Sequence, residues 1–176
     1  MPEPIQLFRV FVGAPSDVIQ EVQTIEELIT EWNRTHGPSA HSRLEFANWR
    51  THSYPAVGKR PQAFINKVVD VSDIIIGIFR ERFGSPTGRA ESGTVEEIQR
   101  GVRRHRAVMV YFANSPDPKR GKRKDEFVRI EAFKRRFGER ALYHTYTTPI
   151  TFERAFRLHL ANTMHDLLAK RPQPLS

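Results

Sequence analysis

The chain has 176 residues, of which 39% are hydrophobic and 27% charged, a size and composition typical of one soluble globular domain. No apolar run is long enough to cross a membrane, and the lack of cysteine excludes disulfides, thiolate metal sites and a cysteine nucleophile. The formal net charge of +8 favours an anionic partner, such as a phosphorylated small molecule or a polyanion.

Segments with strand character alternate along the chain with segments of helical periodicity. In chain order we expect a strand at 7–14, a helix at 16–36, a strand at 43–49, a helix at 61–70, a strand at 72–79, a helix at 94–105, a strand at 107–112, a helix at 125–137, a strand at 141–146 and a helix at 151–170. The third strand contains DIIIGIF, a continuous β-branched run typical of a strand that is buried on both faces.

The ends of the chain complete this interpretation. We expect residues 1–170 to form a single domain, and 171–176, with its two prolines, to be a tail or the start of a linker. The N-terminus has no basic segment followed by an apolar run, so we expect no secretory signal. Together with the absence of cysteine, this favours the cytoplasm.

The alternation predicts parallel βαβ units with right-handed crossovers. At this length the common solution is an α/β, three-layer flavodoxin-like fold, with a five-stranded parallel sheet in the order 2-1-3-4-5. In that order ligands bind outside the carboxyl ends of strands 1 and 3. The segments that follow these strands are 13–17 (GAPSD) and 80–94, and the second leads into GRAESGTVEEI, which carries Glu91, Glu96 and Glu97.

The sequence lacks the motifs of several familiar sites. It has no GxxxxGK[ST] phosphate-binding loop, no GxGxxG dinucleotide loop and no pair of acidic residues after the first strand, as a phospho-acceptor receiver domain would need. GAPS does not match the GxSxG nucleophile elbow. The seven histidines are scattered, so we expect no metal site.

A basic run, KRGKRK at 119–124, lies between turn signals and a helical pattern, which indicates an exposed, solvated loop. It contains no interleaved aromatic residue for base stacking, and the chain has no recognisable nucleic-acid-binding motif. We therefore do not expect nucleic acid as a partner.

Spacing alone gives Glu97 a structural role. Thr94 suits a helix N-cap and Glu97 stands three residues later, the spacing of a capping box. Ser16 or Asp17 would cap the first helix in the same way. We expect Glu96 to be a solvated charge at the positive end of its helix. The chemical alternative is that Glu97 points into a pocket between the loops after strands 1 and 3.

Three stretches, VFVGAPSDV, SDIIIGIFRERFGSPTGRAESGTVEEI and AVMVYF, resemble a TIR-like family of bacterial proteins that carry an N-terminal domain of formally unknown function. That domain lies within the wider group of TIR and nucleoside 2-deoxyribosyltransferase-like folds. Deoxyribosyltransferases carry a Gly-Thr-x-x-Glu element at this helix start, matched here by Gly93, Thr94 and Glu97. TIR enzymes carry a serine and an aromatic residue before the same glutamate, where this chain has Ser92 and Gly93.

The resemblance implies an N-glycosidase that cleaves NAD, with Glu97 as the catalytic carboxylate. NAD would be the substrate, and no cofactor is implied. Breaking an N-glycosidic bond passes through an oxocarbenium-like state, which an adjacent carboxylate stabilises or traps. The cationic nicotinamide leaves as a neutral molecule, so no general acid is needed. The family also implies bacterial antiphage defence, with activation by self-association or by a partner domain or protein.

Further residues are candidates for substrate binding. Arg80 and Arg89 could hold a pyrophosphate, and Phe83, Tyr54 and Trp49 could stack on a ring. The candidate set is Gly13, Ala14, Ser16, Tyr54, Arg80, Phe83, Arg89, Ser92, Gly93 and Thr94. The stretch 50–61 corresponds to the loop that gates the site in TIR-like proteins.

Two alternatives stay open. The protein could be a nucleoside or nucleotide N-glycosidase or a deoxyribosyltransferase, as the Gly-Thr-x-x-Glu element suggests; a neutral base would then need a proton donor, such as Glu91. It could instead be a non-enzymatic TIR-like assembly or signalling adaptor, in which Glu97 only caps its helix.

Overall fold

The computed structural model describes residues 4–48 and 61–170, and within these ranges parallel strands alternate with helices. The strands are β1 (Gln6–Gly13), β2 (Ser42–Asn48), β3 (Ile74–Phe79), β4 (Ala107–Ala113) and β5 (His144–Tyr146). The helices are α1 (Ile19–Thr35), α3 (Pro61–Val71), α4 (Gly93–Arg103), α5 (Lys122–Gly138) and α6 (Pro149–Lys170). The sheet has the order β2-β1-β3-β4-β5 and every pairing is parallel, so the flavodoxin-like fold predicted from the sequence is confirmed.

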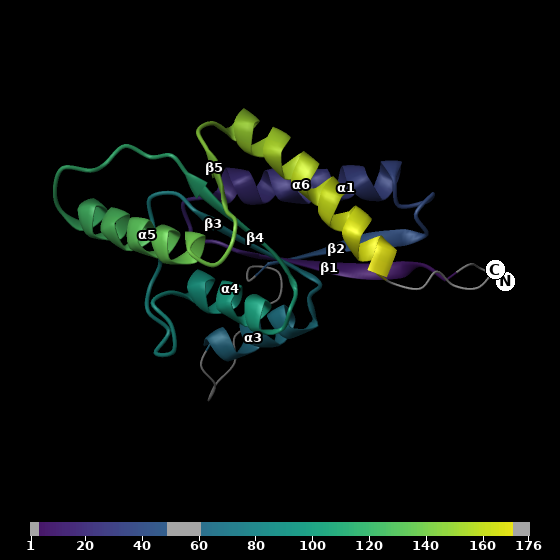
Figure 1. Ribbon diagram of the computed structural model, residues 1–176, viewed down its shortest axis with the longest axis horizontal. Helices are drawn as coiled ribbons and strands as arrows, with labels where there is room; N and C mark the ends of the chain where they lie inside the picture. The colour runs from purple at the N-terminus through teal and green to yellow at the C-terminus, as the bar shows by residue number, and fades with distance from the viewer. Residues whose placement is uncertain (1–3, 49–60, 171–176) are drawn as a thin grey trace.

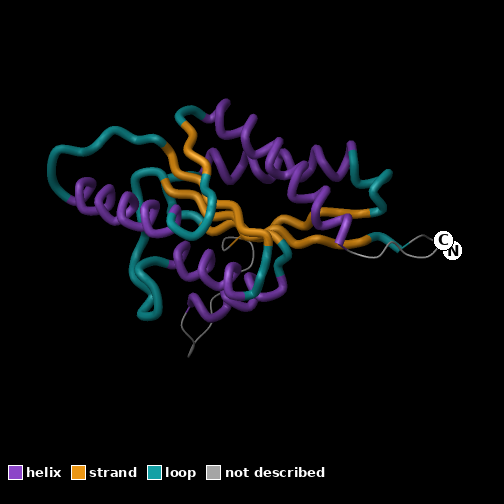
Figure 2. Tube along the Cα trace, in the orientation of Figure 1, coloured by secondary structure: helices purple, strands orange, loops and turns teal. Residues whose placement is uncertain are grey.

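The helices cover both faces of the sheet and form the outer layers. Figures 1 and 2 show α1 and α6 side by side on one face, with α3 and α4 on the other. Helix α5 packs on the same face as α4, because Ile130 and Phe133 share a buried cluster with Val95 and Ile98. The crossover helices therefore cover both faces, with α1 and α6 on one and α3, α4 and α5 on the other, as a doubly wound sheet requires.

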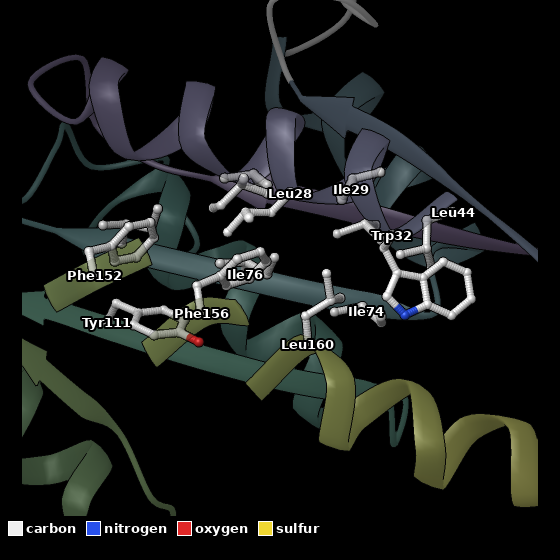
Figure 3. Packing of buried hydrophobic residues seen from close by; sticks show 14 of the residues in the cluster. Leu28, Ile29, Trp32, Leu44, Ile74, Ile76, Tyr111, Phe152, Phe156 and Leu160 are labelled. Carbon is white, nitrogen blue, oxygen red and sulfur yellow. The ribbon is translucent and has the colours of Figure 1, made fainter. Parts of the chain in front are cut away.

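Strand β3 is buried along its whole length, as its apolar run predicts. Its side chains alternate between the two faces. Ile74, Ile76 and Ile78 pack beneath α1 and α6, in the cluster that Figure 3 shows, whereas Ile75 belongs to the cluster beneath α3. Burial on both faces holds β3 at the centre of the sheet and fixes where its carboxyl end lies.

The start of α1 differs from the prediction. The helix begins at Ile19, and Val18 occupies the N-cap without a side-chain hydrogen bond, so neither Ser16 nor Asp17 caps it. Asp17 Oδ2 instead accepts hydrogen bonds from the backbone N–H groups of Glu81 and Arg82, at 2.8 and 3.1 Å. The carboxylate therefore joins the loop after β1 to the loop after β3, which is a contact that local spacing does not reveal.

The predicted basic loop is also shorter than expected. Helix α5 begins at Lys122, so half of the run 119–124 lies in its first turn. Gly121 precedes it at φ 77°, a conformation that favours glycine. Lys124 lies in the first turn of α5, where its positive charge is unfavourable to the helix dipole. The carboxylate of Asp117, 2.6 Å from Lys124 Nζ, offsets this charge. Within 4–48 and 61–170, no helix combines the length and apolar character needed to span a membrane.

Candidate active site

A cleft of about 400 Å³ lies at the carboxyl ends of β1 and β3, where the sheet order reverses. Four segments that are distant in sequence line it: the loop after β1, the start of α3, the loop after β3 and the start of α4. They contribute Ala14 and Pro15; Pro61, Gln62 and Ile65; Gly84, Ser85, Pro86 and Thr87; and Gly93, Thr94 and Glu97. Both loops that the topology predicts at the ligand end therefore contribute to one cleft.

Glu97 lies near the start of α4, and its side chain is 5% exposed. Its Oε1 accepts a hydrogen bond from Gln62 Nε2 at 3.0 Å. Its Oε2 is buried and finds no hydrogen-bond partner among the residues that the structure describes. Burial raises the pKa of Glu97 to about 8, the bond from Gln62 opposes this rise, and the nearby charge of Glu96 adds to it. At neutral pH the Glu97 carboxyl therefore largely keeps its proton.

The last residue of β1, Gly13, gives this carboxyl its space. A β-carbon at position 13 would stand 1.9 Å from Glu97 Oε2, closer than any real contact. Gly93 is similar but less tight, since a β-carbon there would meet the flexible end of Gln62 at 3.0 Å. Small residues at 13 and 93 thus allow α4 to bring Glu97 against the end of β1.

The capping prediction for Thr94 and Glu97 is wrong. The N-cap of α4 is Ser92, whose extended backbone ends the loop and whose Oγ accepts from the Val95 N–H at 3.3 Å. The helix thus begins at Gly93, two residues earlier than a cap at Thr94 would require. Thr94 lines the cleft, and Glu97 bonds to Gln62 rather than to the start of its own helix.

Glu96 is buried rather than solvated, with 4% of its surface exposed. Its Oε1 accepts from Asn66 Nδ2 at 2.7 Å, and its Oε2 accepts from the hydroxyl of Thr87. The prediction failed because α3 packs beside α4 and covers this side of the helix.

The two candidate arginines do not line the cleft. Arg80 pairs with the buried carboxylate of Glu21, with Nη2 2.6 Å from Oε1, and the Tyr146 hydroxyl donates to the same oxygen at 2.7 Å. Arg89 is exposed on the loop that includes Thr87. Arg80 therefore has a structural role as the ion-pair partner of buried Glu21, whereas Arg89 is exposed to solvent.

Phe83 and Ser16 also lie outside the cleft lining. The Phe83 ring is 1% exposed and stacks on Phe79, with ring centroids 5.6 Å apart, while the Arg129 guanidinium covers it. Ser16 Oγ accepts a hydrogen bond from Arg82 at 2.9 Å. Phe83 is thus part of the core, where its ring is not available to stack on a ligand.

The remaining candidates lie away from the cleft or outside the residues that the structure describes. Glu91 is half-exposed and pairs with Arg136 at 2.5 Å, and it does not line the cleft. The structure does not describe two further candidate segments: 49–60, which holds Trp49, Tyr54 and most of the expected gating loop, and 171–176. Within the part of the chain that the structure describes, no three histidine, aspartate or glutamate side chains form a group that could hold a metal ion.

Gln62, Asn66 and Thr87 surround the carboxylates of α4, and sequence reasoning missed all three. One signal was present: Gln62 and Asn66 are polar residues one turn apart on the same helix, so they share a face. Nothing in the sequence indicates which group that face meets, because Glu96 and Glu97 lie 30 and 35 residues away from their partners.

The sequence from 9 to 161 matches the model of a family described as a domain of unknown function (DUF4062). No curated protein matches the chain. Among solved structures, apo translation elongation factor SelB from Methanococcus maripaludis is 14% identical with a TM-score of 0.50, and the match covers 97% of this chain and 36% of that one. The chain therefore spans about a third of the length of SelB.

Two further solved structures are similar at lower scores. Oxidised flavodoxin 1 from Bacillus cereus is 10% identical with a TM-score of 0.43, covering 91% of this chain and 97% of that one. The TIR domains of the activated Roq1 resistosome are 13% identical with a TM-score of 0.38, covering 93% and 85%. Similarity at such identities bears on the fold alone.

Proposed function

The chain belongs to the DUF4062 family, and we propose that it is an N-glycosidase that cleaves NAD, with Glu97 as the catalytic carboxylate. One observation carries the proposal. Glu97 lines the cleft at the point where this fold binds ligands, with one carboxyl oxygen held by Gln62 and the other without a hydrogen-bond partner within the described ranges. A carboxyl that is buried, oriented and only half-bonded in a cleft is typical of a functional group.

The chemistry suits a single carboxylate. When the bond between C1′ and the nicotinamide nitrogen breaks, its electron pair stays on the nitrogen and nicotinamide leaves neutral. Positive charge develops at C1′, and ionised Glu97 stabilises it or traps it as an ester that water then opens. Because the site is shielded from solvent, this attraction is stronger than it would be in water.

The raised pKa of Glu97 fits a cationic substrate. In the free protein, burial favours the protonated carboxyl. A cationic nicotinamide ring beside the carboxyl favours the ionised form and lowers that pKa. Binding of NAD thereby converts Glu97 to the carboxylate that the reaction needs, whereas a neutral ring provides no such driving force.

The volume of the cleft and the net charge of the protein are compatible with a dinucleotide ligand. The cleft volume of about 400 Å³ falls in the range of small-molecule sites. The net charge of +8 favours a ligand with a pyrophosphate, and exposed Arg89 is our candidate for contacting it.

Nicotinamide release from NAD by the purified protein tests the proposal. We expect Glu97→Gln to lower the rate by at least ~100-fold. Glu91→Gln is the matched control, since Glu91 is an exposed carboxylate that pairs with Arg136 outside the cleft, and it should retain activity. The assay is run over a range of protein concentrations because we propose activation by self-association or by a partner. An unchanged rate in Glu97→Gln would contradict the assignment of the site.

A second candidate function uses the same residue differently. A nucleoside or nucleotide N-glycosidase or a deoxyribosyltransferase must protonate a neutral leaving base, and the raised pKa of Glu97 supplies a proton at neutral pH. Glu97 would then replace Glu91 as the proton donor, because Glu91 is paired with Arg136. Release of free base from deoxynucleosides, with NAD left intact, supports this alternative.

The cellular role is part of the proposal. We place the protein in the cytoplasm, as a component of bacterial antiphage defence signalling. The adaptor alternative gave Glu97 a capping role, which Ser92 fills instead. An adaptor would assemble with rising concentration but release no nicotinamide at any concentration.

A further inference from the structure

A chain of side-chain hydrogen bonds joins the wall of the cleft to Glu97. The Thr87 hydroxyl donates to Glu96 Oε2, and Asn66 Nδ2 donates to Glu96 Oε1 at 2.7 Å. Gln62 Nε2 donates both to Asn66 Oδ1 at 3.4 Å and to Glu97 Oε1 at 3.0 Å. Three segments, the loop after β3, α3 and α4, are thus connected through polar groups alone.

The direction of these bonds is set at Glu96. A carboxylate only accepts hydrogen bonds, so both of its neighbours must donate. Asn66 therefore turns its NH₂ group toward Glu96 and its oxygen toward Gln62. Gln62 must then present its own NH₂ group to Asn66, and the same group reaches Glu97. Thr87 fits this direction because its oxygen accepts from the Ala90 N–H at 3.1 Å, which leaves its hydrogen for Glu96.

Burial prevents the chain from reversing. Asn66, Glu96 and Glu97 are each at most 5% exposed, so water cannot replace a lost partner. If the Gln62 amide turned over, its oxygen would face Asn66 Oδ1, and two acceptors would meet. In a buried network, turning one amide also breaks the hydrogen bonds of its neighbours, so the observed arrangement is held.

We propose that Glu96 and Asn66 are positioning residues for Glu97: they set the direction of the Gln62 amide, so that Oε1 receives a hydrogen bond and the carboxyl is held in one orientation at the cleft. The catalytic part of this inference rests on the proposed function of Glu97. The orientation of the carboxyl, however, can be measured without any substrate.

The experiment compares two asparagines that each make two hydrogen bonds. Asn66→Leu removes the link between Glu96 and Gln62. Asn33→Leu is the matched control, because Asn33 bonds to the backbone N–H and C=O of Leu44 at 2.7 and 2.8 Å, between α1 and β2. Asn66→Ala, which needs no additional space, is made alongside Asn66→Leu in case the larger side chain prevents folding.

Two readouts are taken on the full chain: the titration of the Glu97 carboxyl carbon by NMR, and the pH profile of nicotinamide release. The bond from Gln62 lowers the pKa of Glu97, so Gln62→Leu should move the titration to higher pH. The Asn66 variants should move it in the same direction and reduce kcat at least tenfold, with a smaller change in KM. The double variant of residues 62 and 66 should shift the Glu97 titration no further than Gln62→Leu alone does. Asn33→Leu should lower Tm but leave the Glu97 titration unchanged.

The outcomes separate this inference from the proposed function. If Gln62→Leu moves the titration and the Asn66 variants do not, the positioning role is overturned. If the titration moves in both but the wild-type protein releases no nicotinamide, the positioning of Glu97 is supported and the proposed NAD cleavage fails. If nicotinamide is released and neither substitution affects the titration, the function is supported and the positioning role fails.

Discussion

Glu97 Oε2 lies against the Cα of Gly13, so closely that a β-carbon at position 13 would stand 1.9 Å from it. The two residues are 84 positions apart, at the end of β1 and near the start of α4. Glycine at position 13 is therefore required by the carboxyl, and the same close approach removes Glu97 from solvent.

Gly13→Ala should displace the Glu97 carboxyl. We expect a loss of about 100-fold in kcat/KM and a destabilisation of about 1–3 kcal/mol. In a Glu97→Ala background the destabilisation should largely disappear, because the next nearest atom outside Glu97, on Phe11, would be 3.4 Å away. Urea denaturation of the four proteins measures this coupling. An equal loss in both backgrounds would show that the clash is not with Glu97.

The stability of the protein should fall between pH 5 and 9 because of Glu97. Its pKa rises from an ordinary 4.5 to about 8 on folding, so the folded state binds the proton more tightly. The resulting stabilisation is fully present below about pH 4.5 and is lost as the pH rises through 8, by up to about 5 kcal/mol. Denaturation at several pH values should show this loss in the wild type and in Glu91→Gln, but not in Glu97→Gln. Parallel curves for the wild type and Glu97→Gln would exclude the raised pKa.

The pH profile of activity should separate the two candidate reactions. NAD cleavage needs ionised Glu97, so kcat/KM should rise with pH and level off above about 8. Cleavage of a neutral nucleoside needs the protonated form, so its kcat/KM should fall over the same range. Profiles are measured for both substrates, with Glu97→Gln as the control that should lack the transition.

Ser92→Ala should destabilise the protein by about 1 kcal/mol, because it removes the N-cap of α4. Thr94→Val, which preserves the shape of the side chain, should cost less, since Thr94 does not cap the helix. Thermal unfolding of both variants shows which substitution lowers stability more. If Thr94→Val were the more destabilising substitution, Thr94 would be the N-cap of α4, as local spacing predicts.

Arg80→Met should destabilise the protein by about 2–3 kcal/mol. It removes the charged partner of Glu21, which is 1% exposed, and among the described residues it leaves this carboxylate with the Tyr146 hydroxyl as its one hydrogen-bond donor. Arg82→Met, which loses a hydrogen bond to Ser16 on the exposed surface, should have a much smaller effect. If Arg80→Met left stability unchanged but raised KM for NAD, Arg80 would be a ligand contact after all.

Much of the fold was predictable because its signals are local. The β-branched run of β3 and the alternation of strands with helices depend on side-chain periodicity, and both predict the doubly wound sheet that the structure contains. The topology in turn predicts where a ligand would lie, and Ala14, Gly93, Thr94 and Glu97 do line a cleft there.

The predictions that failed depend on groups far apart in sequence. Asp17 looked like a helix cap but bonds to the loop after β3, and Glu96 looked solvated but is covered by α3. In both cases the rejected role is the local one. Asp17 and Glu96 each bond to a segment far away in sequence, which the spacing of residues around a helix start does not reveal.

By itself, the sequence determined the fold class, the order of the sheet and the placement of Glu97 at its switch point, because periodic burial specifies how strands and helices pack. Only the tertiary structure decided what surrounds Glu97: Gln62 bonded to one oxygen, Gly13 against the other, and Glu96 directing the amides behind them. Hydrogen-bond direction and pKa depend on which groups meet after folding, and those groups are brought together only when α3 and α4 pack on the same face of the sheet.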